Sequence, residues 1–451
     1  MAVNPADSAV FGTLYGSDVM RAVFDEAAFF RRMLDVEAAL ARVQGRLGLI
    51  PAEAAAAISE AAGTVALDPA ELAASVRRVG YPVVGVVAAL TRAAGAEAGR
   101  WTHWGATTQD IMDSAQALQI RDGFSLIRSD LTATVRALAD RAEAHRGTVM
   151  AGRTHLQHAL PVTFGLKCAV WFAPLVTHIA RLDQLRPRVE LVQFGGATGT
   201  LASLGAEGLA VADALAAELA LGAPALPWHV ARDGVAEAVG FLGLLCGSLA
   251  KLATDVILLA QTEVAEAAEP FEAGRGGSST MPQKRNPIAS EYILAAARSV
   301  QALVPVMQGA MAADQERATG PWQAELLALP QAFVLAHGAL RHARDLAEGM
   351  TVDPARMLHN LEATHGLIMS EAVMMGLAPL LGRGTAHHVV RHACDAALAE
   401  GIGLAEALAL EPTVAAQLDA AAIARLTDPQ TYLGSTQAFI DRALSAARAV
   451  T

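Results

Sequence analysis

Apolar residues recur at three- and four-residue steps through most of this chain, which is the spacing of amphipathic helices. The first clear run covers residues 24–47, and shorter helical stretches follow, separated by Pro51, Pro69 and Pro82. A long helix is predicted over residues 110–145, which contain no proline and a single glycine. Further long helices are predicted over residues 161–185, 234–268, 287–313 and 321–347.

Helices of this length must bury one another, so the pattern predicts an all-α fold built on a bundle that oligomerises. The composition agrees, because 53% of residues are hydrophobic but only 5% are aromatic, which suits close-packed helices better than a sheet. Gly349 and the helix start at Asp353-Pro354 mark a boundary. We therefore predict an N-terminal domain over residues 1–105, a central bundle over 106–350 and a C-terminal domain over 351–451.

The charge of the chain excludes several classes of partner. A formal net charge of −11 argues against binding to nucleic acid or to an anionic membrane, so an anionic substrate would need a local group of Lys and Arg. The N-terminus does not read as a signal peptide, and the longest apolar stretches, residues 168–180 and 242–249, are too short to span a bilayer. We expect a cytoplasmic protein.

No motif for a cofactor or a metal ion stands out, and none is predicted. The glycine-rich run at residues 194–200 is not followed by the Lys-Ser/Thr of a phosphate-binding loop. The three cysteines, Cys168, Cys246 and Cys394, are far apart and fall in apolar helical patterns. They are predicted to be reduced thiols in the core.

The strongest chemical signal is the segment 274–287, GRGGSSTMPQKRNP, which we call the signature segment. A run this rich in Gly and Ser between two long helices predicts a mobile loop with a function. Asn286 is a good N-cap and Pro287 a good first helical residue, so the segment is expected to end at a helix N-terminus, where partial positive charge favours an anion. Lys284 adds a full positive charge.

The signature segment resembles the GSSxMPxKxNP motif of the fumarase/aspartase superfamily at every fixed position. Residues 103–110 (HWGATTQD) and 152–163 (GRTHLQHALPVT) resemble two further regions of that family, in the same order and at the same spacing. The resemblance implies a three-domain helical homotetramer without a cofactor. Each active site would draw residues from three subunits and bind a small di- or tricarboxylate.

The resemblance also implies roles for individual residues. Ser278 takes the position of the catalytic base, and Lys284 and Asn286 take positions that bind a substrate carboxylate. His155 falls where several of these lyases carry a general acid, with Glu291 at the position of its carboxylate partner. Asp110 is expected to cap a helix and orient its neighbours. The remaining substrate-binding positions implied are His103, Thr107, Thr108, Thr154, Gln157, Met281 and Arg317.

The chemistry of the family explains these residue types. Removing a proton beside a carboxylate places a second negative charge on that group, and each well-placed donor stabilises the resulting aci-carboxylate by roughly 3–4 kcal/mol. Thr107, Thr108, Lys284 and Asn286 could supply such donors. A serine hydroxyl is a poor base in water, so Ser278 can act only where Lys284 and backbone N–H groups stabilise its alkoxide.

Three segments most resemble bacterial 3-carboxy-cis,cis-muconate cycloisomerases: residues 103–110, 316–325 and 428–435. These enzymes close a γ-lactone, because a carboxylate of the substrate adds across a conjugated double bond of the same molecule. In that reaction Arg317, Lys284 and either Arg153 or Arg298 would neutralise substrate carboxylates. His155 departs from this pattern, since cycloisomerases are expected to have Trp there and adenylosuccinate- and argininosuccinate-type lyases to have His. A lyase that releases fumarate from a substituted succinate is therefore the second interpretation, and a catalytically silent binding protein is the third.

Overall fold

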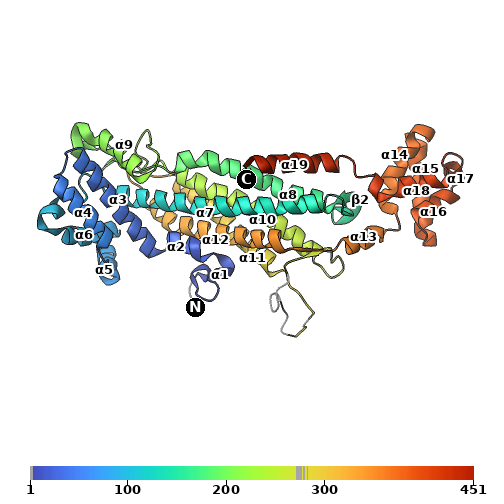
Figure 1. Ribbon diagram of the computed structural model, residues 1–451, viewed down its shortest axis with the longest axis horizontal. Coiled ribbons are helices and arrows are strands. Elements are labelled where there is room, and N and C mark those ends of the chain that lie inside the picture. Colours follow the sequence, from blue (N-terminus) through green and yellow to red (C-terminus); the bar gives the residue numbers. More distant parts are fainter. Residues whose placement is uncertain (1–3, 271–276, 278–279, 282, 451) are drawn as a thin grey trace. The chain divides into compact units, whose positions relative to one another are not determined.

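The computed structural model describes residues 4–270, 277, 280–281 and 283–450 (Figure 1). Five long helices, numbered in chain order, dominate it and lie where the apolar periodicity predicts helices. Their bounds are α7 Thr108–Ala144, α8 Phe164–Val189, α10 Asp233–Leu259, α11 Ile288–Ala310 and α12 Pro321–Gly349.

Shorter helices precede the long ones, and prolines set where three of them begin, as predicted. The single helix predicted over residues 24–47 is in fact two, because Asp25 ends one and its carboxylate accepts a hydrogen bond from Ala28 N at the start of the next, at 2.7 Å. The bounds are η1 Pro5–Asp7, α1 Gly12–Tyr15, α2 Asp18–Phe24, α3 Glu26–Arg46, α4 Ala52–Thr64, α5 Pro69–Val79, α6 Val83–Ala98 and η2 Gly99–Trp101.

The remaining helices fall between α8 and α10 and after α12. The predicted helix start at Asp353-Pro354 is confirmed, since the Asp353 carboxylate accepts a hydrogen bond from Arg356 N at 2.9 Å and Pro354 begins the helix. The bounds are η3 Ala202–Glu207, α9 Gly208–Leu219, α13 Pro354–Glu362, η4 Leu367–Met369, α14 Ser370–Leu381, α15 Arg383–Glu400, α16 Leu404–Leu410, α17 Pro412–Ala415, α18 Ala420–Thr427, η5 Pro429–Thr431 and α19 Thr436–Val450.

Two short antiparallel strand pairs are the exception to the all-helical prediction. Strand β1 (Val149–Thr154) pairs with β2 (Gln157–Thr163), and β3 (Ala267–Ala268) pairs with β4 (Thr351–Val352). The prediction that a helix starts at Pro161 was wrong, because Pro161 lies in β2 and α8 begins at Phe164. The helix predicted to run to Ala268 likewise ends at Leu259.

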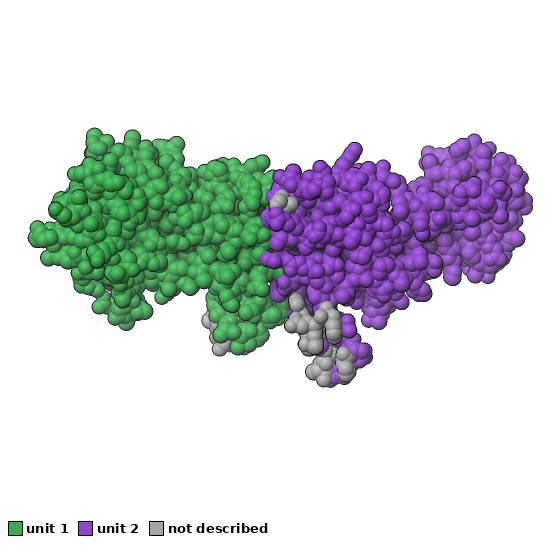
Figure 2. All heavy atoms as spheres, viewed as in Figure 1, with its two compact units in different colours: residues 1–130, 178–250, 292–341 green, residues 131–177, 251–291, 342–451 purple. Residues whose placement is uncertain are grey.

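The chain divides into two compact units, coloured separately in Figure 2. Unit 1 comprises residues 1–130, 178–250 and 292–341, and unit 2 comprises residues 131–177, 251–291 and 342–451. In unit 1 the Phe124 ring from α7 contacts Phe241 from α10 and Phe333 from α12, with ring centroids 6.0 and 5.0 Å apart. In unit 2, buried residues of α14 and α15, such as Val373 and Val390, build a separate core.

Helix α10 contradicts the expectation that every apolar stretch of the chain is too short to span a bilayer. Among the described residues it is the one single helix long and apolar enough to cross a bilayer, with a mean hydropathy of 1.8 over its best 18-residue window. A bent pair, residues 354–362 and 367–381, passes the same test only when taken together. Half of the α10 window is buried inside the chain, and core helices also satisfy this criterion.

The cysteines confirm the prediction of free thiols. Cys168 and Cys246 are buried, and Cys394 is half-buried against the core of unit 2. Burial raises the pKa of Cys168 and of Cys246 to about 12, so both thiols stay protonated at neutral pH.

Candidate active site

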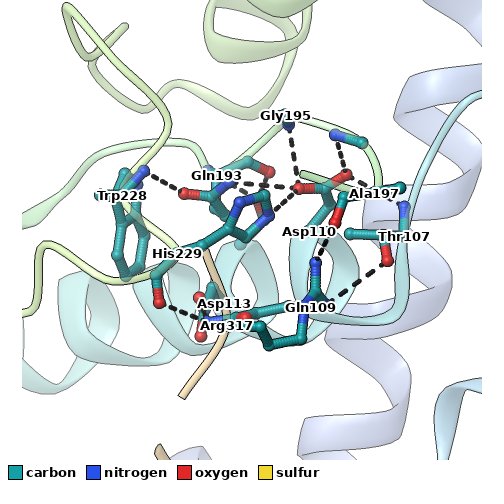
Figure 3. A network of polar contacts seen from close by, with 12 residues as sticks. Thr107, Gln109, Asp110, Asp113, Gln193, Gly195, Ala197, Trp228, His229 and Arg317 are labelled. Atoms are coloured by element: carbon teal, nitrogen blue, oxygen red, sulfur yellow. Dashed lines mark hydrogen bonds and ion pairs between the residues drawn. The ribbon is translucent and has the colours of Figure 1, made fainter. Parts of the chain in front are cut away.

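The Asp110 carboxylate, in the first turn of α7, ties together two loops of unit 1 (Figure 3). Its Oδ2 accepts hydrogen bonds from Thr107 N at 3.0 Å and Gly196 N at 2.9 Å, and its Oδ1 accepts one from Gly195 N at 2.9 Å. Asp110 is fully buried, so these donors replace the water that the charge has lost. The predicted role in capping and orientation is confirmed.

His229 completes this arrangement, although sequence reasoning missed it. Its Nε2 lies 2.7 Å from Asp110 Oδ1, and its side chain is only 4% exposed. A Cβ added at Gly195 would lie 2.9 Å from His229 Cε1 and 2.7 Å from Pro227 Cβ, so only glycine fits at that position in the loop. The glycine-rich run at residues 194–200 is thus a tightly packed backbone turn beside Thr107.

Two predicted substrate-binding residues meet at this loop. Arg317 donates from Nη2 to Ala197 O at 2.9 Å, and its Nη1 lies 3.5 Å from Thr107 Oγ1 (Figure 3). Thr108 is the first residue of α7. Arg317, Thr107 and Thr108 are all partly accessible to solvent. A guanidinium beside a hydroxyl group at the start of a helix is suited to binding a carboxylate.

His103 lies in the same segment and is held from α3. Its Nδ1 lies 2.6 Å from Oε1 of Glu37, a carboxylate that is only 1% exposed. Burial alone would lower the pKa of His103, but the charge and hydrogen bond of Glu37, with a further contribution from Asp110, outweigh burial and raise it above the ordinary value.

In unit 2, the hairpin between β1 and β2 carries three predicted site residues at its tip. Thr154 pairs with Gln157, and the two residues between them, His155 and Leu156, have φ values of 51° and 64°. Both lie in the left-handed region, as a two-residue hairpin turn of this type requires. Residues 154–157 are all exposed, so His155 is accessible to solvent at the turn.

Three further predicted residues line one cavity of unit 2. Met281, Lys284 and Asn286 face a space of about 960 Å³, together with β3 and β4. Lys284 is exposed, and its backbone N donates to Met281 O at 3.1 Å, which forms a turn within the signature segment. Ser278, the predicted base, lies outside the described residues.

The helix that follows the signature segment begins differently from the prediction. It starts at Ile288 rather than Pro287. The Glu269 carboxylate accepts hydrogen bonds from Ala289 N at 3.0 Å and from Ser290 N at 2.8 Å in its first turn. The positive end of the α11 dipole is therefore already occupied, and the positive charges that line the cavity are those of Lys284 and Arg285.

Glu291 lies exposed in the first turn of α11, and the described residues show no contact between it and His155 within one chain.

Arg153, considered above for substrate binding, instead pairs with a buried carboxylate. It forms a bidentate pair with the fully buried Glu266, at 2.7 and 2.9 Å, and Asn360 donates to the same carboxylate. Arg153 therefore stabilises unit 2 and is a poor candidate for a substrate carboxylate.

Comparisons with known proteins identify families and individual proteins that this chain resembles. A family model described as Lyase matches residues 15–302, and one described as Adenylosuccinate lyase C-terminus matches residues 366–443. The 3-carboxy-cis,cis-muconate cycloisomerase of Pseudomonas aeruginosa is 47% identical over 99% of this chain and 97% of its own. The crystal structure of the 3-carboxy-cis,cis-muconate lactonizing enzyme of Pseudomonas putida matches with a TM-score of 0.93 and 42% identity, covering 98% of this chain and 100% of that one. The fumarate lyase of Mesorhizobium sp. BNC1 matches with a TM-score of 0.91 and 49% identity, covering 96% and 98%.

Proposed function

This chain belongs to the fumarase/aspartase superfamily of lyases, and we propose that it interconverts a 3-carboxy-cis,cis-muconate and its γ-lactone without a cofactor. The observation that carries the proposal is the nearly end-to-end similarity, at 47% identity, to the cycloisomerase of Pseudomonas aeruginosa. The site chemistry supports it, because Lys284 and Arg317 supply positive charge on two separate parts of the chain that carry predicted site residues.

Lactone formation rearranges electrons within a single substrate molecule and takes up one proton from the enzyme. One substrate carboxylate oxygen adds to the conjugated double bond, the electron pair moves onto the carbon beside another carboxylate, and a proton from the enzyme then quenches that carbanion. Holding the carboxylate and the alkene together removes roughly 7–11 kcal/mol of barrier. The enzyme must therefore fold a trianion and supply one proton, and in the reverse direction Ser278 removes that proton.

The working enzyme is proposed to be a cytoplasmic homotetramer of three-domain subunits, with domains at residues 1–105, 106–350 and 351–451. The proposed site residues occur in three separate groups on the described chain: beside the 194–200 loop, in the unit 2 cavity and at the hairpin tip. Three subunits contributing one group each would bring His155, Lys284 and Thr107 to one substrate. No nucleic acid or membrane partner is proposed.

A fumarate-releasing lyase is the second candidate, and His155 is the observation that favours it. By motif resemblance the residue falls where several such lyases carry a general acid, and the fumarate lyase of Mesorhizobium sp. BNC1 is 49% identical. Such an enzyme would abstract a proton through Ser278 and protonate the leaving amine through His155.

Absorbance assays on the purified enzyme distinguish the candidates. Loss of the conjugated diene of 3-carboxy-cis,cis-muconate is expected, and would support the cycloisomerase. Appearance of fumarate from a panel of N-succinyl adducts, with no change in the muconate, would replace that proposal with the lyase. No reaction in either assay would overturn both and favour a binding protein.

A substitution at the hairpin tip provides an independent prediction. Since cycloisomerases are expected to carry Trp at this position, His155→Trp should keep lactone formation within about tenfold but lower any fumarate release by roughly 10²–10⁴-fold, the usual contribution of a general acid. Steady-state rates on both substrates measure this.

Leu156→Trp places the same ring on the other residue of that turn, where φ is 64°, and serves as the matched control for steric effects. Equal losses in both variants on both substrates would remove His155 from the proposed chemistry.

A further inference from the structure

Helix α3 presents two buried polar side chains to the 103–110 segment from one face. Glu37 and Gln44 are seven residues apart and each is 1% exposed, among neighbours that are apolar. Gln44 Nε2 donates to Trp104 O at 2.7 Å, and Glu37 Oε1 lies 2.6 Å from His103 Nδ1. One hydrogen bond fixes the backbone of the turn, and the other fixes the imidazole.

The turn itself is strained at His103. Its φ is 60°, a left-handed conformation that costs a residue with a bulky side chain of order 1–3 kcal/mol. Strain of this kind persists only where surrounding contacts impose it, and the two contacts from α3 do so. The imidazole that results is 22% exposed, so one edge is buried against Glu37 while part of the ring remains accessible.

The charges around His103 favour a cation there. Glu37 from α3 and Asp110 from α7 are the charged groups that act on it among the described residues. Asp110 is satisfied by backbone amides and His229, whereas the imidazole is the one hydrogen-bond partner recorded for Glu37 on the described chain. A carboxylate buried to this degree is strongly destabilising unless an opposite charge accompanies it.

We propose that Glu37 is a positioning residue that holds His103 as an imidazolium, whose free Nε2–H binds a carboxylate of the substrate. With Nδ1–H donated to Glu37, a neutral ring would present only the Nε2 lone pair, which repels an anion. The imidazolium donates from both nitrogens. His103 is thereby specific for a carboxylate and unsuited to a hydroxyl or amide hydrogen at the same position.

This inference rests on the proposed function for the nature of the substrate, and it predicts a direction of pH dependence. The imidazolium is present below the raised pKa of His103 and is lost as the pH rises through it, so substrate binding weakens on the alkaline side. Glu37→Gln keeps the shape and a hydrogen-bond acceptor but removes the charge. It should shift the alkaline limb of kcat/KM toward acid by about one unit or more and raise KM about tenfold near that limb. The change in kcat should stay below about threefold.

The experiment compares wild type, Glu37→Gln and Gln44→Leu as full-length proteins. Gln44→Leu loosens the same turn without touching the imidazole, so it should leave the alkaline limb in place. Equal movement of the limb in both variants, or an unmoved limb in Glu37→Gln with KM and kcat lowered together, would overturn the proposal. Circular dichroism establishes that each variant is folded.

A binding measurement separates this inference from the proposed function, because it requires no turnover. Tricarballylate, a tricarboxylate without a double bond, is titrated into each protein by calorimetry near pH 8 in buffers of different ionisation enthalpy. Glu37→Gln is expected to take up more protons per site on binding than wild type does, because less of its free imidazole is already protonated. The same proton uptake in both proteins would overturn the inference even if both assays above succeed, and the expected difference would sustain it even if neither proposed substrate reacts.

Discussion

Ser278→Ala is expected to lower turnover by at least about 10³-fold while leaving helical content and subunit assembly unchanged. The proposed base removes or returns the proton beside the aci-carboxylate, and the family resemblance implies that Ser278 has this role, with Lys284 to stabilise its alkoxide. Water could replace the hydroxyl group only inefficiently. Rapid-mixing assays at saturating substrate, with circular dichroism and size-exclusion chromatography on the same samples, measure the outcome.

The adjacent Ser279→Ala is the matched control, because it removes the same hydroxyl from the same Gly/Ser run. It should retain far more activity than Ser278→Ala. A Ser278→Ala variant with near-normal rates would show that the proton goes elsewhere, and equal losses in the two variants would point to the conformation of the segment rather than to a base.

Arg232→Met is expected to destabilise the protein by about 3–5 kcal/mol. Arg232 is 2% exposed and forms bidentate pairs with Asp113, at 2.7 and 3.1 Å, and with Glu325, whose Oε1 lies 2.9 Å from Nε. Both carboxylates are fully buried, and burial raises the pKa of Glu325. Without the guanidinium, two negative charges would remain in the core of unit 1.

Urea denaturation followed by circular dichroism measures this loss. Arg188→Met is the control, since Arg188 makes a comparable bidentate pair with Glu237 but on the surface, where the two side chains are 56% and 38% exposed. The urea concentration at the unfolding midpoint of Arg188→Met should barely differ from that of the wild type. Similar shifts in both variants would mean that the buried pair contributes no more than an exposed one.

The long helices could be predicted from the sequence because their apolar period extends over many turns and prolines or Asp-Pro pairs mark several starts. The β1–β2 hairpin could not, since its strands are six and seven residues long and its second strand runs directly into the apolar pattern of α8. Pro161 was read as a helix start for the same reason. Local pattern cannot distinguish a short buried strand from the first turn of a helix.

In the candidate site, too, residues within local motifs could be predicted, whereas residues that contact those motifs from distant parts of the sequence could not. Residues within motifs, such as Thr107 and Lys284, could be selected from the sequence. Residues that hold those motifs in place could not, because Glu269 caps α11 from twenty positions away and His229 reaches Asp110 across more than one hundred. Glu37 did leave a signal, since it interrupts the apolar face of α3 at a core-facing position.

The Glu269 cap has a consequence for how the signature segment can respond to a ligand. Glu269 precedes the signature segment, and the amides of Ala289 and Ser290 that it binds follow the segment. The cap therefore joins the two ends of a stretch of about 20 residues. Joining the ends of a free chain of that length costs about 2–3 kcal/mol of entropy. Folding has already met this cost, so substrate binding does not have to meet it again. Glu269 also lines the cavity that contains Lys284. Glu269→Gln would therefore lower affinity by weakening the tether at the edge of the proposed site.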